Sequence, residues 1–261
     1  MKYGDALFIT GTDTGVGKTM VTGYLQALYA TGGYRTIPYK PIQSGGIRQG
    51  QQVIAEDVAF YQSLSSLPYE QEMLCTYCME PAVSPHLAAK QVGMTMEWGR
   101  IDNHLTMLRK HHDLVFVEGA GGLAVPLAKD ERGLYMTTDL IARLQLPLLL
   151  VTQPGLGTIN HTVLTVAYAR QKKIPILGLI INRMPENPSE MHIDNVQMMS
   201  ELTGLPILGT LPEMDGTAME TLRSQQTPWP NYIDMTMLMT RLQQVKEEPL
   251  QIKQTEGSAC N

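Results

Sequence analysis

A glycine-rich run near the start of the chain carries residues that can bind phosphate. From Gly11 to Thr19 the sequence reads Gly-Thr-Asp-Thr-Gly-Val-Gly-Lys-Thr, between the apolar stretch Ala6–Ile9 and a helix-like segment. Glycines let backbone N–H groups turn inward around phosphate oxygens, Lys18 can reach the terminal phosphates, and the Thr19 hydroxyl can bind Mg²⁺. This order of strand, loop and helix predicts a site for ATP or GTP.

The spacing of this loop departs from the strict phosphate-loop motif. Thr12 stands where the motif has its first glycine, and Gly11 lies one place earlier, so the loop is a variant. The alternative interpretation is an ordinary glycine-rich turn between a strand and a helix. A Gly-Lys-Thr triplet at such a junction favours phosphate binding.

Three charged residues follow predicted strands or begin a predicted helix and could lie beside this loop. Glu118 and Asp57 could complete a magnesium site with Thr19, because Mg²⁺ takes few protein oxygens and the rest from water or phosphate. Lys40 would add a second ammonium group to stabilise negative charge during a reaction. The alternatives are a solvated carboxylate for Glu118, a favourable place in a helix's first turn for Asp57, and an exposed lysine for Lys40.

Short apolar stretches alternate along the chain with segments of helical period. The apolar stretches cover 6–9, 36–39, 114–117, 148–151, 176–181 and 207–208, and the helical segments cover 18–29, 98–109, 137–144, 159–170 and 189–202. The alternation predicts an α/β fold, doubly wound, with a mostly parallel sheet and helices on both faces. Ligands of such sheets bind at the carboxyl ends of the strands. The residues expected there are Thr10, Lys40, Glu118, Gln153 and Asn182.

Several segments lie outside this alternation. The polar, glycine-rich stretch 43–52 is predicted to be a mobile active-site loop, leading into a helix that carries Asp57. We expect a single domain over residues 1–245 and a disordered tail over 246–261, which is polar and lacks aromatic residues and periodicity. Cys75 and Cys78 lie in a segment that alternates like an edge strand, and without a second ligand pair they are predicted to be buried free thiols.

Composition narrows the classes of partner. The chain has 261 residues, 43% of them hydrophobic, with a net charge of -5. An acidic balance with only short basic clusters disfavours nucleic acid and anionic membranes as partners. The first strand begins within a few residues of the N-terminus, and the apolar runs are of strand length, so we expect no signal peptide, no membrane span and a cytoplasmic location.

Taken together, these motifs resemble those of the dethiobiotin synthetases, which have a P-loop NTPase fold. The resemblance runs from Phe8 to about Leu211 and is carried by Thr10–Thr19, Tyr39–Ile42 with Ser44 and Gly45, Glu56 and Asp57, Glu80 and Pro81 with Ser84–His86, Val117–Gly122, and Leu156–His161. The phosphate loop alone would also fit chromosome-partitioning ATPases and cobyrinate amidation enzymes. The segments beginning at Tyr39 and Leu156 narrow the resemblance to dethiobiotin synthetases.

The resemblance implies an enzyme of biotin biosynthesis. Such an enzyme joins diaminopelargonic acid and CO₂ at the expense of ATP, with Mg²⁺, to give dethiobiotin, ADP and phosphate. One substrate amine takes up CO₂ as a carbamate, a carbamate oxygen attacks the γ-phosphate, and the second amine displaces phosphate from the mixed anhydride. The protein supplies positioning and charge, and no nucleophilic side chain is required.

The resemblance also implies site residues, each at its matching position. Lys40 and Lys18 would be catalytic, Thr19, Asp57 and Glu118 would hold the metal, and Thr14 and Ser44 would contact the diamine or carbamate. The nucleotide-binding set would be Gly15, Val16, Gly17, Lys18, Thr19, Met20, Asp57, Glu118, Gly119, Ala120, Gly121, Asn182, Arg183, Pro212, Glu213 and Met214, with Asn182 as the adenine reader. The substrate carboxylate would be captured by Gly157, Thr158, Ile159 and Asn160 of the neighbouring subunit, which implies a homodimer.

The sequence departs from the family pattern at three positions. Gly15 stands where some members carry an acidic residue, Arg183 where an aspartate is common, and Glu213 where a bulkier apolar residue is usual. The resemblance therefore implies phosphate binding more strongly than it implies a preference for one nucleotide base.

The phosphate loop also fits two alternative functions, an amide ligase and a switch ATPase. A cobyrinate-type amide ligase would need ammonia from a glutaminase domain, and little sequence follows Leu211. A partitioning-type switch ATPase would usually carry an extra lysine early in the phosphate loop, where this chain has Thr12, Asp13 and Thr14. A switch ATPase of this kind would also be expected to have a basic or amphipathic terminal helix, and the sequence does not indicate one.

Overall fold

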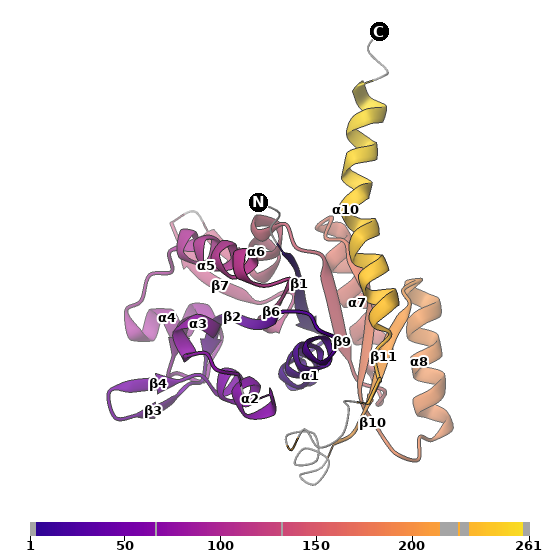
Figure 1. Ribbon diagram of the computed structural model, residues 1–261, viewed down its shortest axis with the longest axis horizontal. Coiled ribbons are helices and arrows are strands. Elements are labelled where there is room, and N and C mark those ends of the chain that lie inside the picture. Colours follow the sequence, from indigo (N-terminus) through magenta and orange to yellow (C-terminus); the bar gives the residue numbers. More distant parts are fainter. Residues whose placement is uncertain (1–3, 66, 132, 215–223, 225–229, 258–261) are drawn as a thin grey trace.

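A seven-stranded parallel sheet organises the structure (Figure 1). The computed structural model describes residues 4–65, 67–131, 133–214, 224 and 230–257, with only the backbone described for 248–257. The strands are β1 (Asp5–Gly11), β2 (Thr36–Ser44), β5 (Cys75–Met79), β6 (Leu114–Gly122), β9 (Leu148–Thr152), β10 (Ile176–Met184) and β11 (Ile207–Pro212). They lie in the order β11-β10-β9-β1-β6-β2-β5, and every neighbouring pair is parallel. The carboxyl ends of all seven strands therefore meet at one edge.

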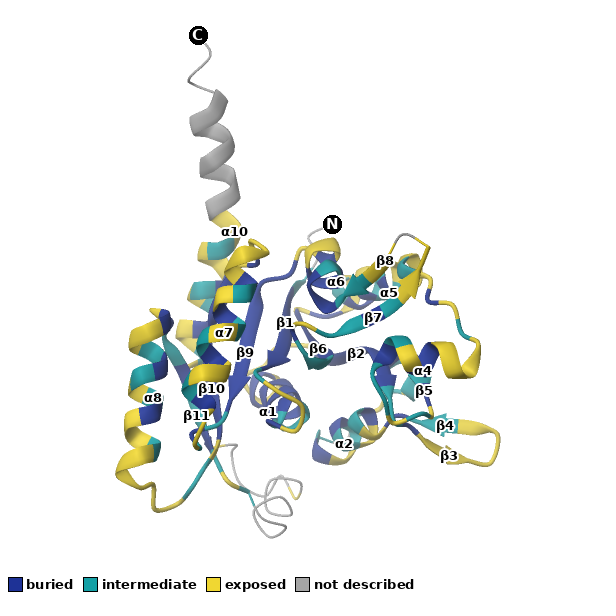
Figure 2. Cartoon of the chain, turned by 180° about the vertical axis from the view of Figure 1, so that it is seen from behind, coloured by how far each residue is buried: buried dark blue, intermediate teal, exposed yellow. Residues whose placement is uncertain are grey.

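The central strands are buried on both faces, which explains their nearly continuous apolar sequences (Figure 2). Side chains alternate between the two sides along a strand. In β1, Phe8 packs into one hydrophobic cluster, whereas Leu7 and Ile9 pack into the other. The sheet thus separates two cores and needs helices on both sides.

The helices supply those two covers. They are α1 (Lys18–Thr31), α2 (Glu56–Ser65), α3 (Gln71–Leu74), α4 (Pro85–Val92), α5 (Trp98–His111), α6 (Thr137–Leu144), α7 (Thr158–Gln171), α8 (Glu190–Thr203) and α10 (Met235–Gly257). Apolar side chains of α1 and α10 join the cluster of Leu7 and Ile9, and those of α5, α6 and α7 join the cluster of Phe8. The predicted doubly wound parallel α/β fold is confirmed.

The stretch predicted to be a mobile loop, 43–52, contains regular structure instead. Strand β2 extends through Ser44, and β3 (Ile47–Gln49) pairs antiparallel with β4 (Gln52–Ile54). The turn between them is possible because Gly50 takes a φ of +61°, which glycine adopts without strain. A second hairpin joins β7 (Pro126–Asp130) to β8 (Gly133–Met136).

Edge strand β5 carries the cysteine pair. Its burial alternates, so that Cys75 is buried and Cys78 is half-buried, both as free thiols. Burial raises the pKa of the Cys78 thiol to about 11, which leaves it protonated and unreactive near neutral pH. The interpretation as free thiols agrees with this placement, although only Cys75 is fully buried.

The C-terminal segment differs from the sequence expectation in its backbone. Helix α10 continues to Gly257 and so includes most of the tail predicted to be disordered, while residues 258–261 lie outside the described part. Lysine, glutamate, glutamine and leucine all have good helix propensity, which a search for apolar periodicity does not register. Disorder of residues 246–261 in solution stays a prediction.

Among the residues that the structure describes, no helix is long and apolar enough to span a membrane.

Candidate active site

The phosphate loop joins β1 to the first turn of α1. Gly15 and Gly17 have φ values of +79° and +94°, which glycine tolerates without strain. A Cβ at Gly17 would lie 1.9 Å from the Asn182 side-chain nitrogen, so the position needs glycine for space as well. Helix α1 begins at Lys18, which places its positive N-terminal end at the loop. The local structure is that of an anion site.

Lys18 turns back over the loop. Its Nζ donates a hydrogen bond to the Asp13 carbonyl oxygen over 3.1 Å, and the residue is buried. Burial lowers the pKa of Lys18, while the nearby Glu118 carboxylate partly opposes that shift. The ammonium group is therefore poorly solvated, which favours its pairing with an incoming anion.

Lys40 lies at the centre of a buried polar cluster directly after the part of β2 that pairs with β6. Its Nζ is 2.8 Å from Glu118 Oε1, 2.5 Å from Asp57 Oδ2 and 3.0 Å from the Gly119 carbonyl oxygen. The Thr19 hydroxyl is 3.0 Å from an oxygen of each carboxylate. The structure therefore brings together Lys40, Thr19, Asp57 and Glu118, as the sequence predicts.

The charges in this cluster stabilise one another. Burial alone would lower the pKa of Lys40, which is 3% exposed, but the Glu118 and Asp57 carboxylates outweigh it and raise the pKa above the ordinary value. Burial would likewise raise the pKa of Asp57, but Lys40 lowers it below 3.8. Lys40 and Asp57 are thus both ionised at neutral pH. These two salt bridges fix the position of the Lys40 ammonium group.

The donor set fits Mg²⁺. One oxygen from each of two carboxylates, Asp57 and Glu118, lies 3.0 Å from the Thr19 hydroxyl oxygen. Mg²⁺ bound with phosphates takes a small number of oxygen ligands of this kind from a protein. The described residues contain no group of three or more histidine, cysteine or acidic side chains that could hold a metal ion. The predicted magnesium site has two acidic side chains, Asp57 and Glu118, and takes its third protein oxygen from Thr19.

The sequence reasoning missed one contact of this cluster. The Tyr61 hydroxyl donates a hydrogen bond to Glu118 Oε2, and its ring is fully buried. Tyr61 follows Asp57 by four residues on α2, so both project from the same side of that helix. That spacing was the available signal, but aromatic residues at helical period usually indicate core packing.

A cleft of about 370 Å³ opens beside the phosphate loop. Its lining consists of Thr12, Asp13, Thr14, Gly15, Val16, Gln153, Gly155, Leu156, Thr158, His161 and Arg183. Thr14 is exposed, and its Oγ1 would lie 3.7 Å from a Cβ at Gly121, so the segment after Glu118 borders the loop. The exposed Arg183, which is in the predicted nucleotide-binding set, also lines this cleft.

The residues predicted to bind the substrate carboxylate lie at the start of α7 and differ in exposure. Gly157 and Asn160 are exposed, whereas the Thr158 hydroxyl is buried against that of Thr152, 2.8 Å away. Thr158 therefore presents backbone rather than side chain to a ligand. Ser44 is half-buried at the end of β2, and no hydrogen bond joins its side chain to Thr14 among the described contacts.

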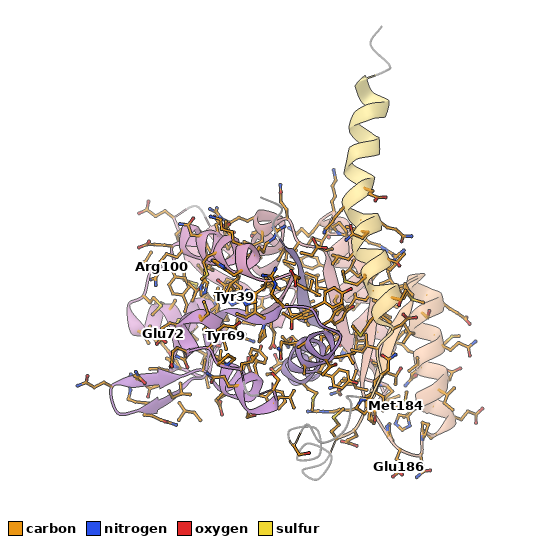
Figure 3. The ribbon with its side chains drawn as sticks, viewed as in Figure 1. Tyr39, Tyr69, Glu72, Arg100, Met184 and Glu186 are labelled. Atoms are coloured by element: carbon orange, nitrogen blue, oxygen red, sulfur yellow. The ribbon has the colours of Figure 1, made fainter. Side chains whose placement is uncertain are left out.

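The residues predicted to bind the base lie at the ends of β10 and β11. The Glu213 N–H donates to the carbonyl oxygen of Met184 over 2.8 Å, and Met184 is labelled in Figure 3. This bond and the pairing of Pro212 with Met184 hold 212–214 beside the end of β10. Asn182 is buried, and its Nδ2 donates to the Val16 carbonyl oxygen over 2.9 Å. Its amide N–H is thus engaged by the phosphate loop. The role of Asn182 as adenine reader stays a prediction.

Comparison with known proteins decides the family. A family model described as an AAA domain matches residues 5–221. The ATP-dependent dethiobiotin synthetase BioD of a Geobacillus species is 40% identical over 226 residues, which cover 87% of this chain and 92% of that protein. The chain belongs to the dethiobiotin synthetase family. The BioD of Anoxybacillus flavithermus is 41% identical over 207 residues, covering 79% of this chain and 91% of that protein.

Solved structures support the fold. The septum site-determining protein MinD complexed with Mg-ADP from Pyrococcus horikoshii aligns over 94% of this chain and 97% of its own, with a TM-score of 0.51 and 16% identity. At that identity the likeness concerns the fold alone. The predicted P-loop NTPase type is confirmed, and the dethiobiotin synthetase family makes this chain an ATP-dependent ligase, as predicted.

Proposed function

We propose that this chain is a cytoplasmic enzyme that converts diaminopelargonic acid, CO₂ and ATP into dethiobiotin, ADP and phosphate. The observation that carries the proposal is the contact of Lys40 Nζ with both Asp57 and Glu118, beside the phosphate loop of a dethiobiotin synthetase relative. A partitioning-type switch would carry its extra lysine early in the phosphate loop, where this chain has Thr12, Asp13 and Thr14. A second buried lysine beside the loop suits a reaction in which a second anion meets the γ-phosphate.

Lys18 and Lys40 are placed to assist such a reaction, which has three steps. One amine of the diamine adds to CO₂ and loses a proton, giving a carbamate. A carbamate oxygen then attacks the γ-phosphorus, and the bond to ADP breaks. The second amine then attacks the carbamoyl carbon and loses a proton. The bond from this carbon to the phosphate oxygen breaks, and phosphate leaves. Lys40 and Lys18 lower the repulsion between the carbamate and γ-phosphate oxygens when these approach.

The predicted magnesium site would neutralise charge in the proposed reaction. Thr19, Asp57 and Glu118 would hold Mg²⁺, which neutralises charge on the triphosphate when bound. The charges of Lys18 and Lys40 already balance those of the two carboxylates within the cluster. The incoming triphosphate therefore needs further positive charge, and the backbone N–H groups at the start of α1 supply part of it.

The substrate carboxylate has a matching place at α7. The helix begins at Thr158 after Gly157, whose φ is +86°, and its first turn includes the exposed Asn160. The positive end of a helix favours a carboxylate. We assign this end to the carboxylate of a diamine bound at the other subunit's phosphate loop, which makes the working unit a homodimer.

The decisive experiment is a product assay. Purified protein, diaminopelargonic acid, bicarbonate, Mg²⁺ and ATP should yield dethiobiotin and phosphate in a ratio of one to one. Hydrolysis of ATP that ignores the diamine would favour a partitioning-type switch, and a requirement for ammonia would favour a cobyrinate-type ligase. The Lys40→Ala variant is the control. Its turnover should fall about a hundred- to a thousandfold while ATP binding changes little.

A further inference from the structure

The two oxygens of Glu118 have different partners. Oε1 accepts from Thr19 Oγ1 at 3.0 Å and from Lys40 Nζ at 2.8 Å, whereas Oε2 accepts from the Tyr61 hydroxyl. Glu118 is 1% exposed and Tyr61 is fully buried, so water does not compete for this last bond. The tyrosine therefore engages the carboxylate oxygen that does not accept from Thr19 or Lys40.

We infer that Tyr61 is a positioning residue for magnesium, acting through Glu118: it holds Oε2 so that Oε1 stays directed at Thr19. This inference rests on the proposed magnesium site. A carboxylate at the end of a strand can rotate about its last bond, and a fixed donor to one oxygen removes that freedom. Hydrogen bonds from outside a metal's own ligands are a common means of orienting those ligands.

The placement of Tyr61 supports an orienting role. Helix α2 carries Asp57 one turn before Tyr61, and Asp57 Oδ1 accepts from the same Thr19 hydroxyl. The ring of Tyr61 lies in the hydrophobic cluster that also contains Val58 and Leu74, which fixes the position of its hydroxyl. Helix α2 thus carries the Asp57 carboxylate and, through Tyr61, orients the carboxylate of Glu118.

Magnesium-dependent binding of ADP provides a test that does not depend on turnover. Calorimetric titrations of ADP at increasing Mg²⁺ concentration should show half-maximal enhancement at a concentration about 10- to 100-fold higher in Tyr61→Phe than in wild type. Saturating Mg²⁺ should restore ADP binding. Phenylalanine keeps the buried ring, and far-ultraviolet circular dichroism with a melting curve verifies the fold.

Tyr29→Phe is the matched control. Tyr29 is also fully buried, and its hydroxyl donates to the Met235 carbonyl oxygen, so the variant loses one buried hydrogen bond far from Glu118. Its Mg²⁺ dependence should match that of wild type. Equal Mg²⁺ dependence in Tyr61→Phe and Tyr29→Phe would overturn the inference while leaving the proposed function intact.

A double-mutant cycle separates orientation from general stability. If Tyr61 acts through Glu118, adding Tyr61→Phe to Glu118→Gln should leave Mg²⁺-dependent ADP binding little changed from that of Glu118→Gln alone. An equal loss in both backgrounds would contradict the inference. Wild-type ADP binding that does not respond to Mg²⁺ at all would instead remove the magnesium site from which the inference starts.

Discussion

The side-chain amide of Asn182 donates a hydrogen bond to the backbone carbonyl of Val16, 2.9 Å away, and so ties the end of β10 to the phosphate loop. The same amide nitrogen lies where a Cβ at Gly17 would have to be. The loop therefore takes its shape partly from a strand two places away in the sheet, since β9 lies between β1 and β10. Asn182 can affect nucleotide binding without touching the base.

Replacing Asn182 with alanine separates these two roles. We expect Asn182→Ala to weaken binding of both ATP and inorganic tripolyphosphate by about 3- to 10-fold, which corresponds to the loss of one buried hydrogen bond. Tripolyphosphate has no base, so a residue that reads adenine would leave its affinity unchanged. Isothermal titration calorimetry with both ligands decides between the loop-shaping role and the adenine-reading role.

Alanine at Gly17 should be far more harmful than alanine at Gly15. Both glycines have positive φ, which costs a residue with a Cβ about 1–2 kcal/mol, but only at Gly17 does the new atom meet Asn182. We expect Gly15→Ala to bind ATP nearly as well as wild type. Gly17→Ala should displace Asn182, break its bond to Val16 and lose more than tenfold in ATP affinity. Similar affinities in the two variants would show that the Asn182 contact does not shape the loop.

The buried charges around Lys40 predict a pH dependence of stability. Because Lys40 lowers the pKa of Asp57 below 3.8, ionised Asp57 stabilises the fold above that pH, and this stabilisation is lost as the pH falls through the lowered pKa. The raised pKa of Lys40 keeps its charge throughout the acid and neutral range. Lys40→Met leaves two carboxylates near each other without the cation. At pH 7 it should cost about 3–5 kcal/mol of unfolding free energy.

This loss should shrink as the pH falls toward 4, because Asp57 no longer has Lys40 to lower its pKa and takes up a proton more readily in the variant. Urea unfolding of wild type and Lys40→Met between pH 4 and 8 measures the difference. A difference that stays constant over this range would mean that Lys40 contributes through packing alone. Gln26→Met, which removes a buried polar side chain in α1, is a control for loss of polarity without loss of charge.

The sequence predicts the phosphate loop and the cluster around it because Lys40 and Glu118 each follow an apolar run and Asp57 lies in the first turn of a helix, although β2 and β6 continue for four residues past Lys40 and Glu118. In a parallel sheet such positions converge, so Lys40 and Glu118 could be placed together without knowing the strand order. Asn182 was located correctly by the same reasoning. Its partner could not be predicted, since nothing local indicates that the end of β10 reaches back to Val16.

Other misses have different physical causes. The segment 43–52 predicts a loop because β3 and β4 have only three residues each, too few to show the alternation that identifies a half-buried strand. The sequence also does not indicate where the Thr158 side chain points, and its predicted contact with the substrate carboxylate stays a prediction. The structure turns its hydroxyl inward to Thr152, a contact that depends on the packing of α7 against β9.

The burial of Thr158 determines how the proposed shared site should be tested. Lys18→Ala removes a cation from the phosphate loop, and because burial already disfavours its charge, the fold should tolerate the change. Asn160→Asp places a carboxylate at the exposed start of α7, where it suits the helix but repels the substrate carboxylate. Each variant alone should form an inactive homodimer.

Mixing the two variants should restore activity if α7 of one subunit serves the phosphate loop of the other. After the two proteins are unfolded and refolded together, each mixed dimer contains one site with both changes and one site made wholly of unaltered parts. Random assembly gives about half mixed dimers, so activity should recover to about a quarter of the wild-type value under two-fold symmetry. Native mass spectrometry measures the mixed fraction. Mixed dimers without activity would place the substrate carboxylate within a single chain and remove the second subunit from the reaction.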